Sequence, residues 1–109
     1  MDNWTISYVG ESRADLLDID GYIRFELLAP KAADRITDKI TDEIRSLSSM
    51  PNRHSLYPDE PWHSLGVRFL PVEKYVVFYY PDEDSKVVNI MRILYSGRNA
   101  NNLLPPEIN

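Results

Sequence analysis

Apolar residues follow two different spacings along the chain, and each spacing predicts one kind of element. In WTISYV, residues 4–9, bulky residues alternate with small or polar ones, which predicts a short β-strand that ends at Gly10. From Ser12 the spacing changes to three and four, the stripe of an amphipathic helix: Leu16, Ile19, Ile23 and Leu27. Ser12 with Asp15 resembles a capping box with a shorter acid, so we expect the first helix to begin there.

A second apolar stripe begins after Pro30, a residue that suits the first turn of a helix. Its members again recur at three and four residues: Ala33, Ile36, Ile40, Ile44 and Leu47. Met50-Pro51 predicts the end of this helix. Because few residues separate the two helices, we expect an antiparallel helix hairpin. Gly21, inside the first helix, is predicted to mark a close approach by the next element.

The second half of the chain predicts a loop and then strands. Residues 51–65 hold three prolines and show no periodicity, which indicates a surface loop. Three runs rich in β-branched and aromatic residues follow at 67–72, 75–80 and 87–95. Their close spacing predicts an antiparallel meander that packs on the helix hairpin, with the first strand in the same sheet. The predicted fold is α+β with the order βααβββ, a mostly antiparallel sheet under one helical layer.

We expect residues 1–98 to form a single domain and residues 99–109 to form a tail with little to pack. In the predicted core, one set of helix residues meets one set of strand residues: Leu16, Ile23, Ile36, Ile40 and Ile44 against Val77, Tyr79, Val88 and Ile90. Strand alternation places Arg92 on the same face as Ile90 and Leu94. We therefore expect Arg92 to form a structural ion pair with a helix acid such as Asp18 or Asp20.

The composition narrows the classes of protein that fit. The chain is 43% hydrophobic and 27% charged, as ordinary globular domains are, and no apolar run approaches the ~20 residues of a membrane helix. No secretion signal is evident, so we expect a cytoplasmic protein. The lack of cysteine excludes disulfides, thiolate metal sites and a cysteine nucleophile. With His54 and His63 as the two histidines, we expect no metal and no cofactor.

Charge is distributed unevenly along the chain. The net charge is −5, and the excess acid lies in residues 1–61, whereas residues 62–109 are balanced. A general nucleic-acid binder concentrates positive charge, which this chain does not do. The acids fall mainly in the predicted helices, where they form a solvated face or attract a basic segment of a partner.

Two segments of the chain together resemble one known family. The first is the R-x-L-P-V-x-x-Y-x-V-F-Y pattern of residues 68–79, and the second is RILYSGRN, residues 92–99. With the strand and the helix hairpin before them, they resemble the RelE/ParE superfamily of toxins from bacterial type II toxin–antitoxin systems, over about residues 4–99. The resemblance implies the fold described above and a cognate antitoxin that wraps the toxin and represses the shared operon. It also implies one of two activities. RelE-like members cut messenger RNA on the ribosome, whereas ParE-like members poison DNA gyrase and have no nuclease activity.

RNA cleavage through the 2′-hydroxyl needs a base, cations for the phosphate and an acid for the leaving oxygen. By the resemblance, Arg98 lies where RelE-like nucleases carry an arginine after the last strand, as a phosphate clamp. A solvated charge or a salt bridge to the helix layer is the alternative. Arg68 lies where they carry a lysine, with an exposed strand cation as the alternative. Tyr95 could stack on an RNA base or end the sheet core.

Other positions depart from the nuclease pattern. Tyr75 stands where the nucleases place an arginine, and Leu103 and Leu104 occupy the region of a tyrosine that they carry. His54 and His63 fall in the proline-rich loop, where nothing nearby in sequence prepares either as a base. We therefore favour a ParE-like toxin without its own chemistry, with a RelE-like mRNA endoribonuclease as the alternative.

The favoured hypothesis is a growth-inhibiting toxin of a plasmid-stabilisation or addiction module. It binds a protein such as DNA gyrase rather than the ribosome and its mRNA, and an antitoxin neutralises it in a hetero-oligomer. We expect no membrane association. Sheet edges accept added strands, so the edge near Trp62 and Tyr75 and the exposed face of the helix hairpin are the predicted partner-binding surfaces.

Overall fold

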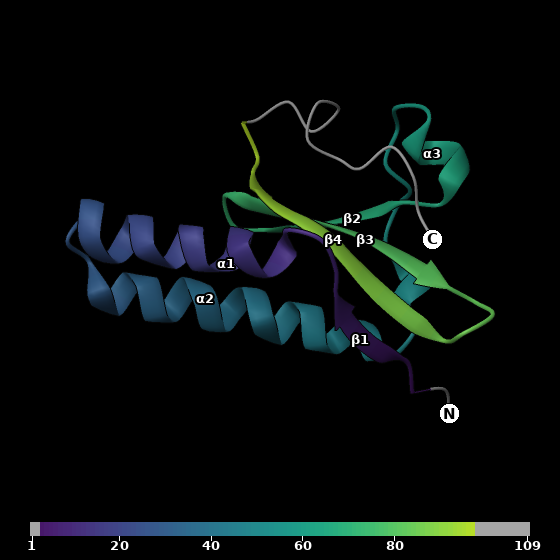
Figure 1. Cartoon of the computed structure of the whole chain (residues 1–109), viewed down its shortest axis with the longest axis horizontal. Helices are drawn as coiled ribbons and strands as arrows, with labels where there is room; N and C mark the ends of the chain where they lie inside the picture. Colours follow the sequence, from purple (N-terminus) through teal and green to yellow (C-terminus); the bar gives the residue numbers. More distant parts are fainter. Residues whose placement is uncertain (1–2, 98–109) are drawn as a thin grey trace.

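A computed structural model describes residues 3–97 and shows a pair of helices packed against a four-stranded sheet (Figure 1). The helical layer consists of α1 (Ser12–Gly21), its π-helical continuation η1 (Tyr22–Glu26) and α2 (Pro30–Arg45). The strands are β1 (Thr5–Tyr8), β2 (Arg68–Val72), β3 (Tyr75–Asp82) and β4 (Val87–Tyr95). Three short helical turns lie between α2 and β2: η2 (Ser46–Ser48), η3 (Pro51–Arg53) and α3 (Trp62–Leu65). Arg98 and the predicted tail, residues 99–109, lie outside the described residues.

The order of the strands across the sheet is β1-β4-β3-β2. β2, β3 and β4 form the predicted antiparallel meander, and β1 joins the sheet as a parallel neighbour of β4. The helix hairpin provides the crossover that a parallel strand pair needs. The predicted α+β fold and its order βααβββ are therefore confirmed.

The core between the helices and the sheet contains most of the residues predicted for it. On the helix side Ile23, Ile40 and Ile44 are buried, while Leu16 and Ile36 are partly buried at the margin of the core. On the sheet side all four predicted residues are fully buried: Val77, Tyr79, Val88 and Ile90. Amphipathic spacing was enough to predict these positions because residues that recur at the helix or strand period lie on the same face of the element.

Tyr79 brings a hydroxyl into this core, and the chain supplies a partner for it. The Tyr79 hydroxyl donates a hydrogen bond to the carbonyl of Pro51, with an oxygen–oxygen distance of 2.7 Å. Burial raises the pKa of Tyr79 to about 12, since the ionised ring would be desolvated there. The bond also fixes η3 to the sheet.

The opposite face of the sheet carries a second apolar cluster, which the sequence analysis did not predict. Its buried residues come from α3, from the segment before β2 and from two strands: Trp62, Val67, Phe78, Met91 and Leu94. The segment 51–65, interpreted as a surface loop, therefore covers part of this second face. Prolines and missing periodicity indicate irregular backbone correctly, but they do not reveal whether its side chains are buried.

A β-bulge in β4 explains how one strand serves both clusters. Phe78 of β3 pairs with Arg92, but the next residue, Tyr79, pairs with Ile90, so β4 holds one extra residue at this point. Beyond the bulge the alternation of faces is shifted, and Leu94 lies in the second cluster rather than beside Ile90. The prediction that Leu94 faces the helices was wrong because it assumed uninterrupted alternation.

Arg92, at the bulge, forms the predicted ion pair with a helix acid, but the acid is Asp15 rather than Asp18 or Asp20. The Arg92 Nε and Nη2 atoms lie 2.7 and 2.9 Å from the two carboxylate oxygens of Asp15. The backbone amide of Ile93 donates a third hydrogen bond to Asp15 Oδ2, at 2.9 Å. Asp15 is only 8% exposed, because it lies on the buried stripe of α1.

Two features that the sequence suggested for α1 are not found in the structure. The Ser12 hydroxyl donates to the carbonyl of Val9, 2.9 Å away, and the Asp15 carboxylate is occupied by β4, so the capping box was wrong. The close approach predicted at Gly21 was also wrong. A Cβ added to Gly21 would meet no heavy atom of another element within 4 Å, and its φ of −62° is ordinary for a helix.

We expect Asp15→Ala to lower the free energy of unfolding by about 3–5 kcal/mol, because the substitution removes the carboxylate that accepts two hydrogen bonds from the largely buried Arg92. Urea denaturation followed by circular dichroism measures the change. Asp18→Ala is the matched control, since Asp18 is exposed on the same helix, and its effect should stay below about 0.5 kcal/mol. Equal effects of the two substitutions would show that the ion pair contributes no special stability.

Candidate functional site

A cavity of about 500 Å³ opens between the helical layer and the sheet end where β3 begins and β4 ends. The residues that line it include Asp18, Tyr22 and Leu27 from the helical layer and Lys74, Tyr75 and Tyr95 from the end of the sheet. We refer to it as the aromatic groove. Its walls are mainly aromatic and aliphatic, with two acids, Asp15 and Asp18, and one lysine among them, a composition that suits protein contacts.

Tyr75 and Tyr95, two of the residues singled out in the sequence, meet in this groove. They are cross-strand partners on β3 and β4, and their rings pack edge to face with centroids 6.0 Å apart. Burial raises the pKa of Tyr75, and the neighbouring Tyr95 raises it further. Tyr95 is 52% exposed, so its ring is accessible to an incoming molecule. A rigid aromatic pair of this kind is the sort of anchor that dominates protein interfaces.

One of the two acids that line the groove already has partners within the fold. Asp15 lines the groove, but its two oxygens accept hydrogen bonds from Arg92 and from the amide of Ile93. Asp15 therefore shapes the groove rather than acting in it.

Arg68, the second cation proposed for RNA cleavage, lies at a different end of the sheet from Tyr95. Arg68 begins β2, whereas Val72, at its other end, pairs with Tyr75, the partner of Tyr95. Four residue steps along a strand correspond to about 13 Å. The Arg68 guanidinium donates to the carbonyl of His54, which gives it a structural contact. The structure does not bring Arg68 and Tyr95 together, and Arg98 lies outside the described residues.

Neither histidine lines the aromatic groove. The ring of His54 packs edge-on against Tyr79, with centroids 6.4 Å apart, and its Nε2 atom is buried without a hydrogen-bond partner among the described residues. Burial lowers the pKa of His54, and the charge of Arg53 lowers it further. His63 lies on α3, where its Nδ1 atom is 3.1 Å from the carbonyl of Tyr57.

Trp62 was expected on an exposed sheet edge as a partner-binding residue, and that placement was wrong. Its side chain is 5% exposed and belongs to the cluster under α3 with Val67 and Phe78. A tryptophan in a proline-rich segment looks exposed from sequence, but here the segment folds back and buries the indole against the sheet. The role of Tyr75 in binding a partner stays a prediction.

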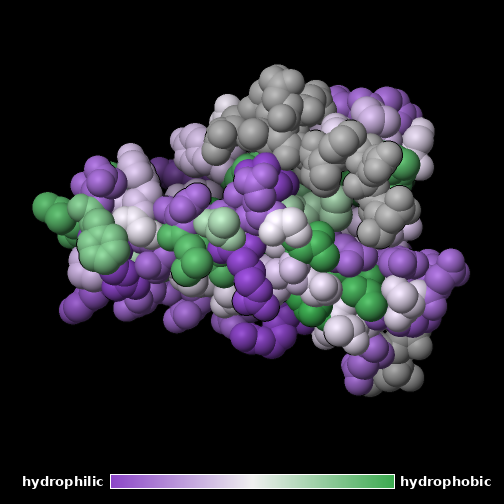
Figure 2. Space-filling view, viewed as in Figure 1, coloured by the Kyte–Doolittle hydropathy of each residue, from purple (hydrophilic) through white to green (hydrophobic). Residues whose placement is uncertain are grey.

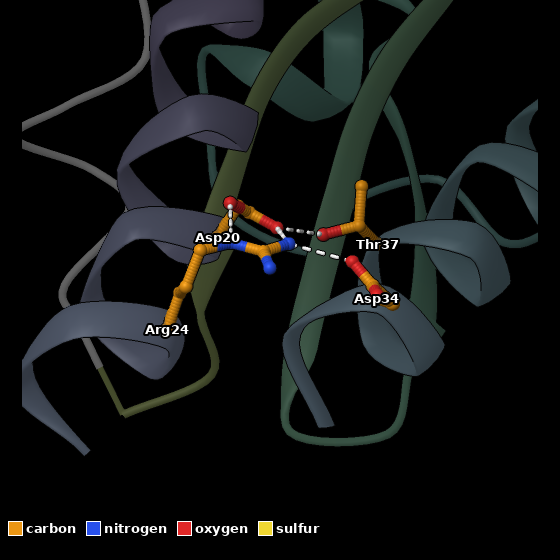
Figure 3. Close-up of polar contacts among 4 residues, drawn as sticks. All are labelled: Asp20, Arg24, Asp34 and Thr37. Atoms are coloured by element: carbon orange, nitrogen blue, oxygen red, sulfur yellow. Dashed lines mark hydrogen bonds and ion pairs between the residues drawn. The ribbon is translucent and has the colours of Figure 1, made fainter. Parts of the chain in front are cut away.

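A polar cluster at the far end of the helix hairpin was missed by the sequence analysis (Figure 3). Arg24 of η1 lies between two acids, with its Nη2 atom 3.0 Å from Asp20 Oδ1 and 2.6 Å from Asp34 Oδ1 on α2. Asp20 also accepts a hydrogen bond from the Thr37 hydroxyl at 3.2 Å. The cluster ties η1 to α2. The spacing of Asp20 and Arg24 by four residues was the signal available in the sequence.

Across residues 3–97, no group of three or more acidic or histidine side chains is arranged to hold a metal ion. In the same part of the chain, no helix combines the length and apolar character that crossing a bilayer requires.

Comparison with known proteins identifies the family. Residues 6–100 match the family described as the ParE toxin of the type II toxin–antitoxin system parDE, and the chain belongs to this family. In fold it is similar to the chromosomal ParDE toxin–antitoxin system from P. aeruginosa, with 22% identity, 87% of this chain and 98% of that chain covered, and a TM-score of 0.69. It is also similar to the RelBE2 toxin–antitoxin complex from Mycobacterium tuberculosis, with 20% identity, 85% and 98% coverage, and a TM-score of 0.63. The comparison with curated proteins gives no match. The predicted membership of the RelE/ParE superfamily, closer to ParE, is therefore confirmed.

Acid should loosen the polar cluster of Figure 3 before it affects the sheet. The hydrogen bond from Arg24 lowers the pKa of Asp20 below its usual 3.8. A lowered folded-state pKa means that the cluster stabilises the hairpin above pH 3.8 and that this stabilisation is lost as the pH falls through the lower folded value. We expect protection factors for amide exchange at Leu27 and Ala29, which bond back to η1, to fall in this range.

The amide of Val9, bonded to Ile90 of β4, is the internal control and should keep its protection. In Asp20→Asn the pH dependence at Leu27 and Ala29 should flatten. A parallel loss at all three amides would mean that acid unfolds the whole chain rather than the end of the hairpin.

Proposed function

We propose that this chain is a toxin that inhibits growth by binding a protein through the aromatic groove, and that a cognate antitoxin neutralises it. The observation that supports this proposal is that Tyr75 and Tyr95 lie together with Tyr22 and Leu27 in one accessible cavity. Aromatic and aliphatic walls favour burial of a partner's apolar side chains, and among residues 3–97 Lys74 is the one cation that lines the groove.

The proposed target is DNA gyrase. Membership of the ParE family supports this choice, since ParE-like proteins were the branch of the resemblance that implied gyrase. The RelE-like alternative, cleavage of ribosome-bound mRNA, requires several cations near a base and a stacking ring. Arg68 is engaged with the carbonyl of His54 and lies away from Tyr95, which favours the binding hypothesis.

The proposed partner is an antitoxin that associates with the chain in a hetero-oligomer. Both similar structures named above are described as toxin–antitoxin systems or complexes, which supports a partner of this kind. We propose that the pair acts in the cytoplasm, as part of a module that stabilises a plasmid or addicts its host.

Induced expression should stop growth and accumulate gyrase cleavage complexes on DNA. Tyr95→Ala should weaken the effect about tenfold or more, because it removes an exposed aromatic anchor from the groove while leaving the buried core intact. Met50→Ala is the control, since Met50 is 71% exposed and does not line the groove. Growth curves and trapped cleavage complexes measure both effects.

The same cells should be examined for cuts in translated mRNA. If mRNA is cut, and Arg98→Ala abolishes the cutting in a chain that still folds, the protein is an endoribonuclease and the gyrase proposal is wrong. If growth, gyrase and mRNA are all unaffected, the chain is not toxic.

Co-expression with the gene of the cognate antitoxin should restore growth and yield a stable complex. A ligand that binds only the folded state raises the melting temperature, so the purified complex should melt above the isolated chain. Co-purification no better than that of an unrelated small protein, with unchanged melting, would count against an antitoxin.

A further inference from the structure

The outer edge of the sheet is covered by an irregular segment. β2 is the last strand in the sheet order, and residues 51–57 lie along its first half. The amide of Tyr57 donates a hydrogen bond to the carbonyl of Val67 at 2.8 Å, and the amide of Phe69 donates to the carbonyl of Ser55 at 3.1 Å. We refer to residues 51–57 as the strap. The strap pairs with backbone groups that an uncovered edge strand would leave open to another chain.

Aromatic residues hold both ends of the strap. At its start, the carbonyl of Pro51 accepts a hydrogen bond from the Tyr79 hydroxyl, 2.7 Å away. At its end, the ring of Tyr57 packs edge to face against the rings of Phe69 and Phe78, with centroids 6.0 and 5.2 Å apart. The strap residue between these ends whose charge changes near neutral pH is a histidine.

The surroundings of this histidine, His54, suit an uncharged ring. The ring packs edge-on against Tyr79, and its Nε2 atom is buried without a hydrogen-bond partner among the described residues. A protonated imidazole carries a hydrogen on both nitrogens, so its Nε2–H group would be buried without an acceptor. Burial raises the pKa of Tyr79 to about 12, so the neighbouring phenol stays neutral and supplies no compensating anion. Removing the charged ring from water therefore costs free energy that the neutral ring avoids.

The charged groups around His54 also oppose a second positive charge. Arg53 precedes it in the strap, Arg68 faces it from β2, and Glu43 of α2 is the acid whose charge acts on it. Both arginines are held in place by carbonyl groups. Arg53 donates to backbone carbonyls in residues 46–50, and Arg68 donates to the carbonyl of His54 itself. Two fixed guanidinium groups against one carboxylate disfavour an imidazolium at this position.

We infer that His54 makes the strap sensitive to acid: the neutral ring keeps the strap on β2, and protonation releases the strap and uncovers this edge of the sheet. In the released strap the ring lies in water. In the closed strap, burial lowers the pKa of His54 below its usual 6.5 and the charge of Arg53 lowers it further, whereas Glu43 opposes the shift.

The direction of these effects sets the pH range of release. Because the pKa of His54 is lower in the closed strap than in the open one, closure has its full stability above pH 6.5. That stability is lost as the pH falls from 6.5 towards the lower pKa of the closed state. Within this interval, each pH unit favours the open strap by about tenfold. No residue of the strap lines the aromatic groove, so release does not depend on the proposed function.

Hydrogen–deuterium exchange of backbone amides, followed by NMR on the full chain between pH 8 and pH 5, tests this inference. After correction for intrinsic exchange rates, protection at Tyr57 and Phe69 should fall by up to about tenfold per pH unit below 6.5. The amide of Val9, which bonds to β4, should keep its protection. Carboxyl groups ordinarily titrate below this interval, so a change within it reports a histidine.

Two substitutions separate His54 from the other histidine. His54→Leu retains an apolar side chain against Tyr79 and cannot bind a proton, so protection at Tyr57 and Phe69 should no longer depend on pH. His63→Gln is the matched control, because the His63 Nδ1 atom also contacts the strap, 3.1 Å from the carbonyl of Tyr57. This variant should keep the pH dependence of the unaltered chain.

Titration of the His54 ring carbons by NMR gives a second measurement that needs no change in the strap. Its midpoint should lie below pH 6.5, and Glu43→Gln should move it lower still, because that substitution removes the charge that opposes the shift. A midpoint at or above 6.5 would overturn the inference even if His54→Leu failed to fold.

The exchange data can contradict the inference in three ways. Protection at Tyr57 and Phe69 can stay constant between pH 8 and pH 5. Their pH dependence can persist in His54→Leu or disappear in His63→Gln, and His54 would then not be the group that titrates. Val9 can lose protection in parallel with them, which would mean that acid unfolds the whole chain rather than releasing the strap.

Discussion

The carboxylate of Asp15 is the point at which the helical layer is fixed to the sheet. It binds the side chain of Arg92 and the amide of Ile93, both on β4, so one acid holds α1 to the central strand by three hydrogen bonds. The attraction between two such charges exceeds the cost of removing them from water only when the geometry is good and their remaining polar atoms are hydrogen-bonded. Here the geometry fixes the position of α1 over the end of the sheet, and with it the width of the aromatic groove, which Asp15 itself lines.

The β-bulge beside Arg92 lets β4, an inner strand, contribute buried residues to the apolar clusters on both faces of the sheet. One extra residue in β4 shifts the alternation, so Ile90 and Ile93 face the helices while Met91 and Leu94 face the segment that contains Trp62. In a strand without a bulge, Ile90 and Ile93 would lie on opposite faces, because successive side chains alternate. The sheet is consequently covered on parts of both faces by a short chain. Within residues 3–97, the groove beside Tyr95 and the outward face of α1 are not covered by other elements.

The elements and the core between the helices and the sheet could be predicted from sequence. Ile40 and Ile44 recur at the helix period and Val88 and Ile90 at the strand period, and burial of one face is the strongest local constraint on a chain. The choice of Asp15 over Asp18 as the partner of Arg92 did not follow, since it depends on how far α1 is rotated on the sheet. The burial of Trp62 depends on the path of an irregular segment, which periodicity does not describe. Tyr75 and Tyr95 were each noted as candidates, but their meeting is a matter of strand register, which one inserted residue can alter.

The surface of α1 and η1 divides into three faces, and two of them are accounted for by the fold. Asp15 and Ile23 face the sheet, and Asp20 with Arg24 faces α2. A helix packed on two sides ordinarily presents polar residues on the third, because exposed apolar groups gain nothing from folding. The third face instead presents Leu17 and Phe25. At this end of the hairpin, charged side chains form the contacts between the two helices, whereas Leu17 and Phe25 lie in solvent. Apolar side chains gather at the end of the helix hairpin that projects beyond the sheet (Figure 2). The stability of the isolated chain would favour the opposite arrangement, with apolar groups between the helices and charged groups in solvent. Leu17 and Phe25 therefore add nothing to the stability of the isolated chain, which depends on the other two faces of α1 and η1.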